Sequence, residues 1–154
     1  MDEKVFLTSE GFKKIEEEAE TLRKVTRPQV VERLVLARSQ GDLSENNEYA
    51  AARDQLAFLD GRLEELEDLI SRAKIVDKSH GSCGCVGFGC RVTVNKGNAD
   101  SVFHIVGDWE ANPSEKKVSY SSPLGQALLG KKVGEEVNFE APAGKILYKI
   151  INID

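Results

Sequence analysis

The sequence predicts an α+β protein: an N-terminal antiparallel α-helical coiled-coil hairpin, residues 1–77, followed by a small, mostly antiparallel β-sheet domain with one short helix, residues 78–154. Three observations predict this fold. Apolar residues recur at helical spacing in the first half of the chain, and a short polar link near residues 41–48 interrupts them. In the second half, apolar and polar residues alternate instead. A chain of 154 residues can form one domain, or two of about 70–80 residues each.

The first arm of the hairpin is predicted from apolar residues three and four positions apart, which lie on one face of a helix. They are Phe12, Ile15, Ala19 and Leu22, followed by Val30, Leu34 and Ala37. Thr8 precedes them and is expected to cap the helix. Pro28 lacks a backbone N–H and disfavours helical geometry in the residue before it, so we expect a kink or a short break there.

The second arm has a more regular repeat with alternating steps of three and four residues. Its members are Tyr49, Ala52, Leu56, Leu59, Leu63, Leu66, Ile70 and Ala73. This is the apolar seam of a coiled coil, continued for more than three heptads. Two arms of about 30 residues joined by a short link predict a hairpin on the order of 45 Å long.

The second half of the chain contains the short alternating runs that are typical of strands. These runs lie at residues 88–94, 102–106, 137–139 and 146–150. Ser122 and Pro123 are favoured at the first positions of a helix, and Gly130 is expected to end that helix. The turn at residues 141–144 predicts a final β-hairpin.

The composition excludes several classes of function. A net charge of −5 argues against non-specific coating of nucleic acid, which requires a basic surface. No apolar run approaches the roughly 18–20 residues of a membrane helix, and the first residues do not form a signal peptide. The 3 cysteines are too few and too close for a disulfide framework, so we expect a cytoplasmic protein. The seam is satisfied within the hairpin, which favours a monomer.

The polar link carries three acidic residues, Asp42, Glu45 and Glu48, near the tip of the predicted hairpin. One interpretation is structural: Asp42 and Glu45 have the spacing of a capping box, and acids stabilise the N-terminal end of a helix. The other is functional: carboxylates presented at a tip could complete a Mg²⁺ site in a partner, or orient a water for attack on a phosphodiester.

Several longer motifs occur in a fixed order along the chain. In the first half they are Leu7-Thr8-x-Glu10-Gly11, Arg27-Pro28, Ala37-Arg38-x-x-Gly41-Asp42-Leu43-Ser44-Glu45-Asn46-x-Glu48-Tyr49 and Ala52-Arg53. In the second half they are Ile105-Val106-Gly107, Ser122-Pro123-Leu124-Gly125, Leu128-Leu129-Gly130-Lys131 and Ala141-Pro142-x-Gly144. Over nearly the whole chain, these motifs resemble the bacterial Gre family of transcript-cleavage factors.

This resemblance implies that the hairpin enters the secondary channel of bacterial RNA polymerase. Asp42 and Glu45 would help to hold a second Mg²⁺ that is shared with the polymerase, and would position the water that cleaves the backtracked nascent RNA near its 3′ end. The factor itself would be no enzyme and would hold no tightly bound cofactor. It would stimulate the polymerase's own Mg²⁺-dependent cleavage.

The resemblance also implies two sets of contacts. Arg38 and Arg53 would contact phosphates of the RNA, although two solvated arginines that offset nearby acids are the alternative. The C-terminal domain, similar in fold to the immunophilin prolyl isomerases, would dock at the rim of the channel. Ser122, Pro123 and Leu124 are the candidate docking residues there, with helix capping as the alternative role.

Other functions remain open at this point. A non-cleaving relative could use the same hairpin to inhibit the polymerase, and a coiled-coil adaptor would also have the seam. Prolyl isomerase activity is suggested by the fold alone. His80, Cys83, Cys85 and Cys90 could form a zinc site, but their spacing is unusual for zinc and Cys90 lies in a strand pattern. We therefore expect loop cysteines and one core cysteine, and we expect His104 to be a packed strand residue.

Overall fold

The computed structural model describes residues 3–42, 45–76 and 84–154. It divides into two compact units. The first contains the described part of Met1–Glu3 and Phe12–Ala73, and the second contains Lys4–Gly11 and the described part of Lys74–Asp154. The predicted boundary between residues 77 and 78 lies outside the described residues. A mixed helix and sheet protein with an N-terminal helical hairpin is confirmed.

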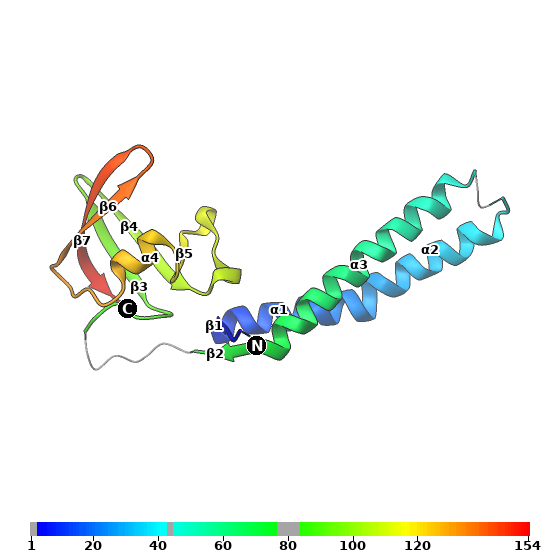
Figure 1. Cartoon of the computed structure of the whole chain (residues 1–154), viewed down its shortest axis with the longest axis horizontal. Coiled ribbons are helices and arrows are strands. Elements are labelled where there is room, and N and C mark those ends of the chain that lie inside the picture. Colours follow the sequence, from blue (N-terminus) through cyan, green and yellow to red (C-terminus); the bar gives the residue numbers. More distant parts are fainter. Residues whose placement is uncertain (1–2, 43–44, 77–83) are drawn as a thin grey trace. The chain divides into compact units, whose positions relative to one another are not determined.

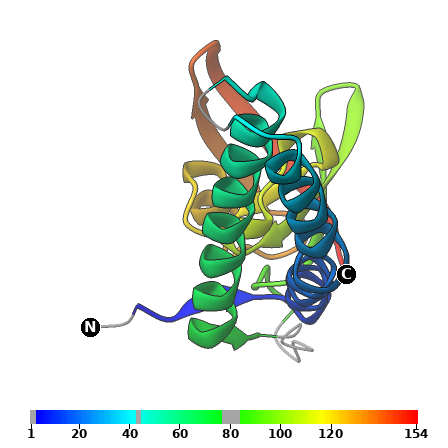
Figure 2. The same ribbon diagram turned by 90° about the vertical axis from the view of Figure 1, so that its right-hand side faces the viewer.

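The hairpin has two helical arms. The first arm consists of α1 (Ser9–Thr21), a π-helical segment η1 (Leu22–Thr26) and α2 (Arg27–Ser39). The second arm is the single helix α3 (Asn47–Arg72). α2 and α3 lie side by side, as Figures 1 and 2 show.

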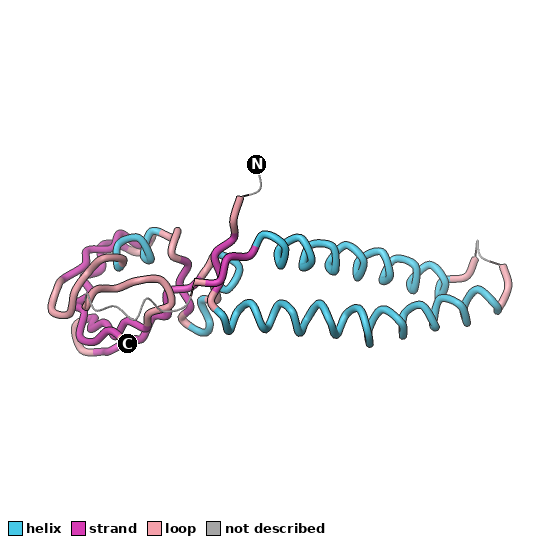
Figure 3. The backbone as a smooth tube through the Cα atoms, turned by 90° about the horizontal axis from the view of Figure 1, so that it is seen from below, coloured by secondary structure: helices cyan, strands magenta, loops and turns pink. Residues whose placement is uncertain are grey.

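The first arm does not break at Pro28. Instead, it passes through η1, in which the Arg27 N–H donates to the Leu22 carbonyl five residues earlier. Pro28 follows directly at the start of α2, where its missing N–H is tolerated. Figure 3 shows both arms as continuous helical coils. The expected kink or short break is therefore corrected to a wider helical turn.

The predicted seam is confirmed along both arms. Every seam residue from Phe12 to Ile70 is buried or half-buried, and Val30, Ala37, Ala52, Leu59 and Leu66 are the most buried of those in α2 and α3. Ala73 differs, because it begins the strand β2 (Ala73–Ile75). Leu69 is buried as well, although it lies outside the predicted series.

Ion pairs on exposed positions connect the two arms. Arg27 Nε lies 2.7 Å from Asp60 Oδ1, Arg62 Nη2 lies 2.9 Å from Glu18 Oε1, and Arg23 pairs with Glu67. Exposed pairs each contribute about 0–1 kcal/mol, so burial of the seam is the main stabilising contribution.

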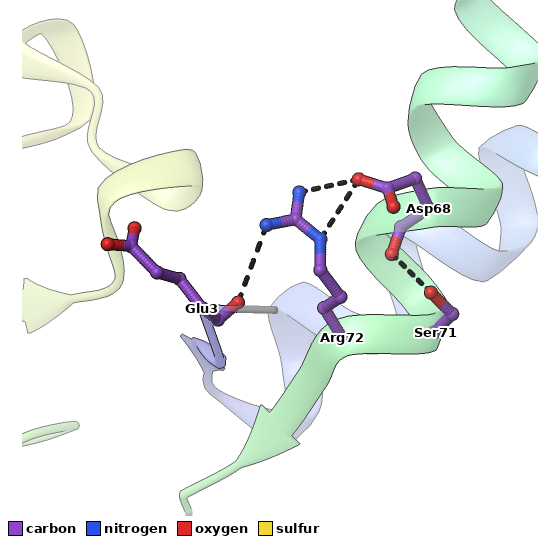
Figure 4. A network of polar contacts seen from close by, with 4 residues as sticks. All are labelled: Glu3, Asp68, Ser71 and Arg72. Carbon is purple, nitrogen blue, oxygen red and sulfur yellow. Dashed lines mark hydrogen bonds and ion pairs between the residues drawn. The ribbon is translucent and has the colours of Figure 1, made fainter. Parts of the chain in front are cut away.

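The open end of the hairpin has a small polar network of its own (Figure 4). Arg72 donates to the Asp68 carboxylate through Nε (3.0 Å) and to the Glu3 carbonyl through Nη1 (3.4 Å). Ser71 Oγ donates to the Asp68 carbonyl at 2.7 Å. These bonds join the last turn of α3 to Glu3, which belongs to the same unit.

The second unit is built on a five-stranded sheet in the order β5-β4-β3-β7-β6. Its strands are β3 (Arg91–Lys96), β4 (Ala99–Val106), β5 (Lys117–Ser119), β6 (Glu136–Ala141) and β7 (Gly144–Ile153). β4 and β5 are parallel, and all other pairs are antiparallel. The short helix α4 (Pro123–Leu128) completes the predicted set of elements.

One face of this sheet forms the core. The core cluster consists of Val86, Val92, Val94, Ile105, Leu128, Val137, Tyr148 and Ile150. α4 supplies Leu128 to this cluster and packs Leu124 against it, which fixes the turn that precedes the helix. Cys90 is buried, as expected for a core cysteine, and His104 is a half-buried strand residue. No helix in the described parts of the chain has the length and apolar character of a membrane span.

Residues Lys4–Gly11, near the start of the chain, belong to this second unit. β1 (Val5–Leu7) pairs with β2, and the Val76 N–H donates to the Leu7 carbonyl at 2.8 Å. The Phe6 ring packs edge-on against Tyr120, with 6.0 Å between ring centroids, and Tyr120 packs against Phe88 at 5.6 Å. Residues from the start of the chain therefore complete the C-terminal domain.

Candidate functional site

The end of α2 is set by backbone geometry. Gln40 caps the helix, and its N–H donates to the Ala37 carbonyl at 3.2 Å. Gly41 follows with a φ of +106°, in the left-handed region that favours glycine. Beyond its two neighbours in the chain, no atom of the described residues lies within 4 Å of a Cβ added at Gly41, so backbone conformation is what favours glycine here. The chain consequently leaves α2 sharply at the beginning of the link.

The start of α3 is set by Asn46. Its Oδ1 accepts a hydrogen bond from the Tyr49 N–H at 3.0 Å, which makes Asn46 the N-cap. Its Nδ2 donates to the Ala37 carbonyl at 2.6 Å, so one side chain links the two arms. The capping-box interpretation of Asp42 and Glu45 is therefore wrong, because the helix begins later and another residue caps it.

The three acids of the link have different surroundings. Asp42 and Glu45 are both exposed in the connection between α2 and α3, and Leu43 and Ser44 between them lie outside the described residues. Glu48 instead lies 2.7 Å from Arg33 Nη2 of the other arm. Arg33 could not be predicted from the sequence, because a cross-arm pair has no local signal there.

Asp42 and Glu45 offer hard oxygen ligands on an exposed surface. Mg²⁺ in proteins keeps several waters and uses one or two carboxylates, so such a pair can complete a site but cannot form one alone. Within the described residues, no group of three or more His, Cys, Asp or Glu side chains could hold an ion.

Arg38 and Arg53 lie on opposite arms near the link. Arg38 is exposed in the last turn of α2 and has no ion-pair partner among the residues that the structure describes. Arg53 is in α3 with 63% of its side chain exposed, and its Nε lies 3.7 Å from Asp54 Oδ1. Such long, exposed pairs are weak, so both guanidinium groups can bind phosphate.

A second candidate site is the docking turn, which we define as residues 119–123. Ser122 is the N-cap of α4: its Oγ accepts from the Gly125 N–H at 3.0 Å and donates to the Ser119 carbonyl at 2.7 Å. The predicted capping role is confirmed. Pro123 is exposed, whereas Leu124 is half-buried and packs against the core. Pro123 is thus the better placed of the two for contact with a partner.

Asp108 holds this turn and was missed by the sequence analysis. Its Oδ1 accepts hydrogen bonds from the hydroxyl groups of Ser119 and Ser121. The Ser121 N–H in turn donates to Ser119 Oγ at 3.1 Å. No spacing rule links an aspartate to serines more than ten positions away, so only the folded chain reveals this contact.

The remaining candidate ligands do not gather into a site in the described part of the chain. Burial, followed by the charge of Arg91, lowers the pKa of His104, which favours its neutral form. Cys85 is half-buried, and its backbone forms an isolated antiparallel β-bridge with the backbone of Lys132. His80 and Cys83, the other two members of the possible zinc site, lie outside the described residues.

Comparison with known proteins gives matches along nearly the whole chain. The family model described as "Transcription elongation factor, N-terminal" matches residues 5–75, and the model described as "Transcription elongation factor, GreA/GreB, C-term" matches residues 81–154. The chain is 46% identical over 155 residues to transcription elongation factor GreA of Caldanaerobacter subterraneus subsp. tengcongensis, a match that covers 99% of both chains.

Two further comparisons are with a second relative and with a solved structure. The chain is 48% identical over 155 residues to transcription elongation factor GreA of Bacillus subtilis, with 98% of both chains covered. Among solved structures, that of GreA factor homolog 1 of Thermus thermophilus is 27% identical, with a TM-score of 0.46 and coverage of 98% of this chain and 99% of that one.

Proposed function

Because this chain belongs to the GreA/GreB family of transcription elongation factors, we propose that it inserts its hairpin into the secondary channel of bacterial RNA polymerase and stimulates cleavage of backtracked RNA. The observation that carries this proposal is the exposed pair Asp42 and Glu45 in a link whose ends are held by Asn46 and Gly41. Because the two ends of the link are fixed, less conformational entropy is lost when its carboxylates bind a partner.

Asp42 and Glu45 would act inside the polymerase. A Mg²⁺ ion shared with the polymerase would supply Lewis acidity and an acidified water. The two side chains would bind this ion weakly and orient the attacking water toward a phosphodiester near the RNA 3′ end. Cleavage would release a short 3′ fragment and leave an extendable end. The factor would therefore not be an enzyme by itself, and it would hold no tightly bound cofactor.

The other exposed residues would hold the complex together. Arg38 and Arg53 would contact phosphates of the extruded RNA, which their exposed guanidinium groups favour. Ser122, Pro123 and Leu124 would place the C-terminal domain at the rim of the channel, with exposed Pro123 as the main contact. A likeness of this domain to the immunophilin prolyl isomerases stays a prediction. We expect the factor to act as a monomer in the bacterial cytoplasm.

Two other functions use the same hairpin. A relative that plugs the channel without cleavage would need the hairpin but not Asp42 and Glu45, and an adaptor would need only the outer faces of the arms. The exposed pair Asp42 and Glu45 favours cleavage over both, because Asn46 caps α3 and neither alternative function requires these two carboxylates.

The decisive experiment uses a stalled, backtracked bacterial elongation complex with 3′-labelled RNA and Mg²⁺. Wild type should release short labelled products, and Asp42→Asn/Glu45→Gln should lower the cleavage rate by about a hundredfold or more while it still binds polymerase. Glu48→Gln is the matched control from the same link. It should lower the rate by no more than about fivefold, because its exposed ion pair contributes at most ~1 kcal/mol.

Each result has a clear meaning. Slower elongation by wild type without cleavage would support the inhibitory function instead. Equal cleavage by wild type and by the double variant would exclude Asp42 and Glu45 as the groups that act.

A further inference from the structure

A three-residue helix, η2 (Asp108–Glu110), follows strand β4 in the C-terminal domain. It carries an acid at each end, with the half-exposed Trp109 between them. The acid at the first end, Asp108, holds the docking turn through the hydroxyl groups of Ser119 and Ser121. The acid at the other end contacts a different part of the same unit.

Glu110 binds the residue that caps α1. The Thr8 N–H donates to Glu110 Oε2 at 2.9 Å, and the Thr8 hydroxyl donates to Glu110 Oε1. Thr8 Oγ1 itself accepts from the Gly11 N–H at 3.1 Å, which confirms the predicted capping role of Thr8. A carboxylate from the C-terminal domain therefore orients the hydroxyl that caps the first helix of the chain. Hydrogen bonds to an ionised acceptor are about twice as strong as neutral ones.

Two glycines permit this close approach. A Cβ at Gly11 would lie 2.0 Å from Glu110 Oε1, and a Cβ at Gly107 would lie 2.1 Å from the Phe6 carbonyl oxygen. Both glycines belong to motifs singled out in the sequence, Thr8-x-Glu10-Gly11 and Ile105-Val106-Gly107. The proposed cleavage chemistry does not use either motif, so they need a separate explanation.

Packing reinforces the hydrogen bonds on both sides of η2. Tyr120 of the docking turn contacts the Phe6 ring edge-on, one residue before the strand end at Leu7. The docking turn and the segment that leads into α1 are thus connected in two ways. Tyr120 packs on Phe6, and η2 connects Asp108, which binds the docking turn, to Glu110, which binds Thr8.

We propose that Asp108 and Glu110 are positioning residues that join the docking turn to the first turn of α1, so that the two move as one piece. This inference rests on the proposed function, because it assigns polymerase contact to the docking turn. Asp108 would set the shape of the surface that binds, and Glu110 would connect that surface to the helix that leads to the link. Neither residue would touch RNA or metal.

The first test measures amide hydrogen exchange by NMR on the full chain, without polymerase. The reporters are the Gly11 amide, whose acceptor Thr8 binds Glu110, and the Ser121 amide, whose acceptor Ser119 binds Asp108. In both Glu110→Gln and Asp108→Asn, both amides should exchange about tenfold faster. Each variant weakens charge-assisted hydrogen bonds, and the equilibrium constant for local opening should rise roughly tenfold as a result. Glu136→Gln, an exposed acid in β6, is the control and should change neither amide. Acceleration on the mutated side alone would overturn the proposal.

The second test separates affinity from cleavage in the backtracked elongation complex. Because the docking turn and the first turn of α1 loosen together, Asp108→Asn should raise the half-saturating factor concentration about tenfold and also lower the saturated rate, at an unchanged unfolding temperature. Glu110→Gln should lower the saturated rate about tenfold and also raise the half-saturating concentration, again at an unchanged unfolding temperature. Gly11→Ala should reproduce Glu110→Gln, because its methyl group displaces the carboxylate even though alanine favours the helix. Thr8→Ser keeps the hydroxyl and should behave as wild type.

The outcomes distinguish the two proposals. If wild type cleaves and Asp108→Asn, Glu110→Gln and Gly11→Ala all match it, the positioning role is wrong. A parallel change of both parameters with a lower unfolding temperature would show a merely structural role and would also overturn it. If wild type itself does not cleave, the proposed function fails, and the exchange experiment still decides whether η2 joins its two neighbours.

Discussion

At the scale of single residues, neighbouring polar side chains have different roles in the link. Glu45 is exposed, Glu48 is neutralised by Arg33, and Asn46 between them caps α3 and bonds the other arm. The motif identified these positions, but it could not assign their roles. The roles follow from where α3 begins, which shifted the cap from Asp42 to Asn46.

Replacement of Asn46 should destabilise the hairpin from its closed end. Asn46→Ala removes the cap of α3 and the bond to the Ala37 carbonyl, so the free energy of unfolding should fall by about 1–2 kcal/mol. Asn46→Asp keeps the acceptor and loses the donor, and should lie between alanine and wild type. Helical circular dichroism in urea measures this, with exposed Asn47→Ala as the control. No loss in Asn46→Ala would contradict the assigned cap.

His104 makes stability depend on pH in a defined direction. Burial and Arg91 lower its pKa below 6.5 in the folded chain, so the unfolded chain binds the proton first. Its contribution is complete above pH 6.5 and is lost as pH falls from there toward the folded pKa. His104→Gln should flatten this part of the stability curve, measured by urea unfolding at pH values between about 5 and 7.5. An unchanged slope would show that other groups cause the dependence.

At the scale of elements, η1 compensates for an irregular spacing of seam residues in the first arm. Apolar seam residues are separated by steps of three and four up to Leu22, but the next fully buried residue is Val30, with half-buried Thr26 between them. Two successive steps of four residues, from Leu22 to Thr26 and from Thr26 to Val30, would rotate the seam away from α3 if the arm were a regular α-helix. A π turn accommodates the additional residue and keeps the seam on the side of α3.

This explanation predicts that the surplus residue, not Pro28, maintains η1. Pro28→Ala should leave the π turn in place, whereas deletion of exposed Val25 should convert the arm to a continuous α-helix. Carbon chemical shifts and amide exchange of Arg27, whose N–H donates five residues back, report the change. Conversion by Pro28→Ala alone would show that the missing N–H is the cause.

Local periodicity explains which elements could be predicted. The two arms, α4 and the final β-hairpin have their signals within a few consecutive residues, and they are confirmed. β5 pairs with β4 in parallel, and β1 pairs with a strand almost seventy positions later, so no local pattern marks them. The contacts of Asp108 and Glu110 were missed for the same reason: their partners are distant in sequence.

At the scale of the whole molecule, the two compact units are not two consecutive stretches of the chain. The first strand and the first turn of α1 belong to the C-terminal domain, although they precede the hairpin. The change of apolar periodicity along the chain predicts two successive halves, and it contains no information on this exchange. Only the pairing of β1 with β2 and of Thr8 with Glu110 reveals it.

A change at the start of the chain should therefore weaken its end. Phe6→Ala removes the edge-on contact with Tyr120, and the C-terminal domain should lose about 1–3 kcal/mol of unfolding free energy. Fluorescence of Trp109, the only tryptophan, follows this domain during urea unfolding. Phe58→Ala is the matched control, because its side chain is 74% exposed and belongs to the hairpin. Equal effects of both variants would contradict the assignment.

The bond between Thr8 and Glu110 also has a consequence for biosynthesis. These residues are 102 positions apart, and a ribosome adds about 5–20 residues per second, so Thr8 is made roughly 5–20 s before its partner. The hairpin, whose two arms both precede Glu110 in the chain, can form during that interval. The cap of α1 therefore receives its carboxylate only near the end of translation, and chains truncated before Glu110 would carry a complete hairpin with an unfinished first turn.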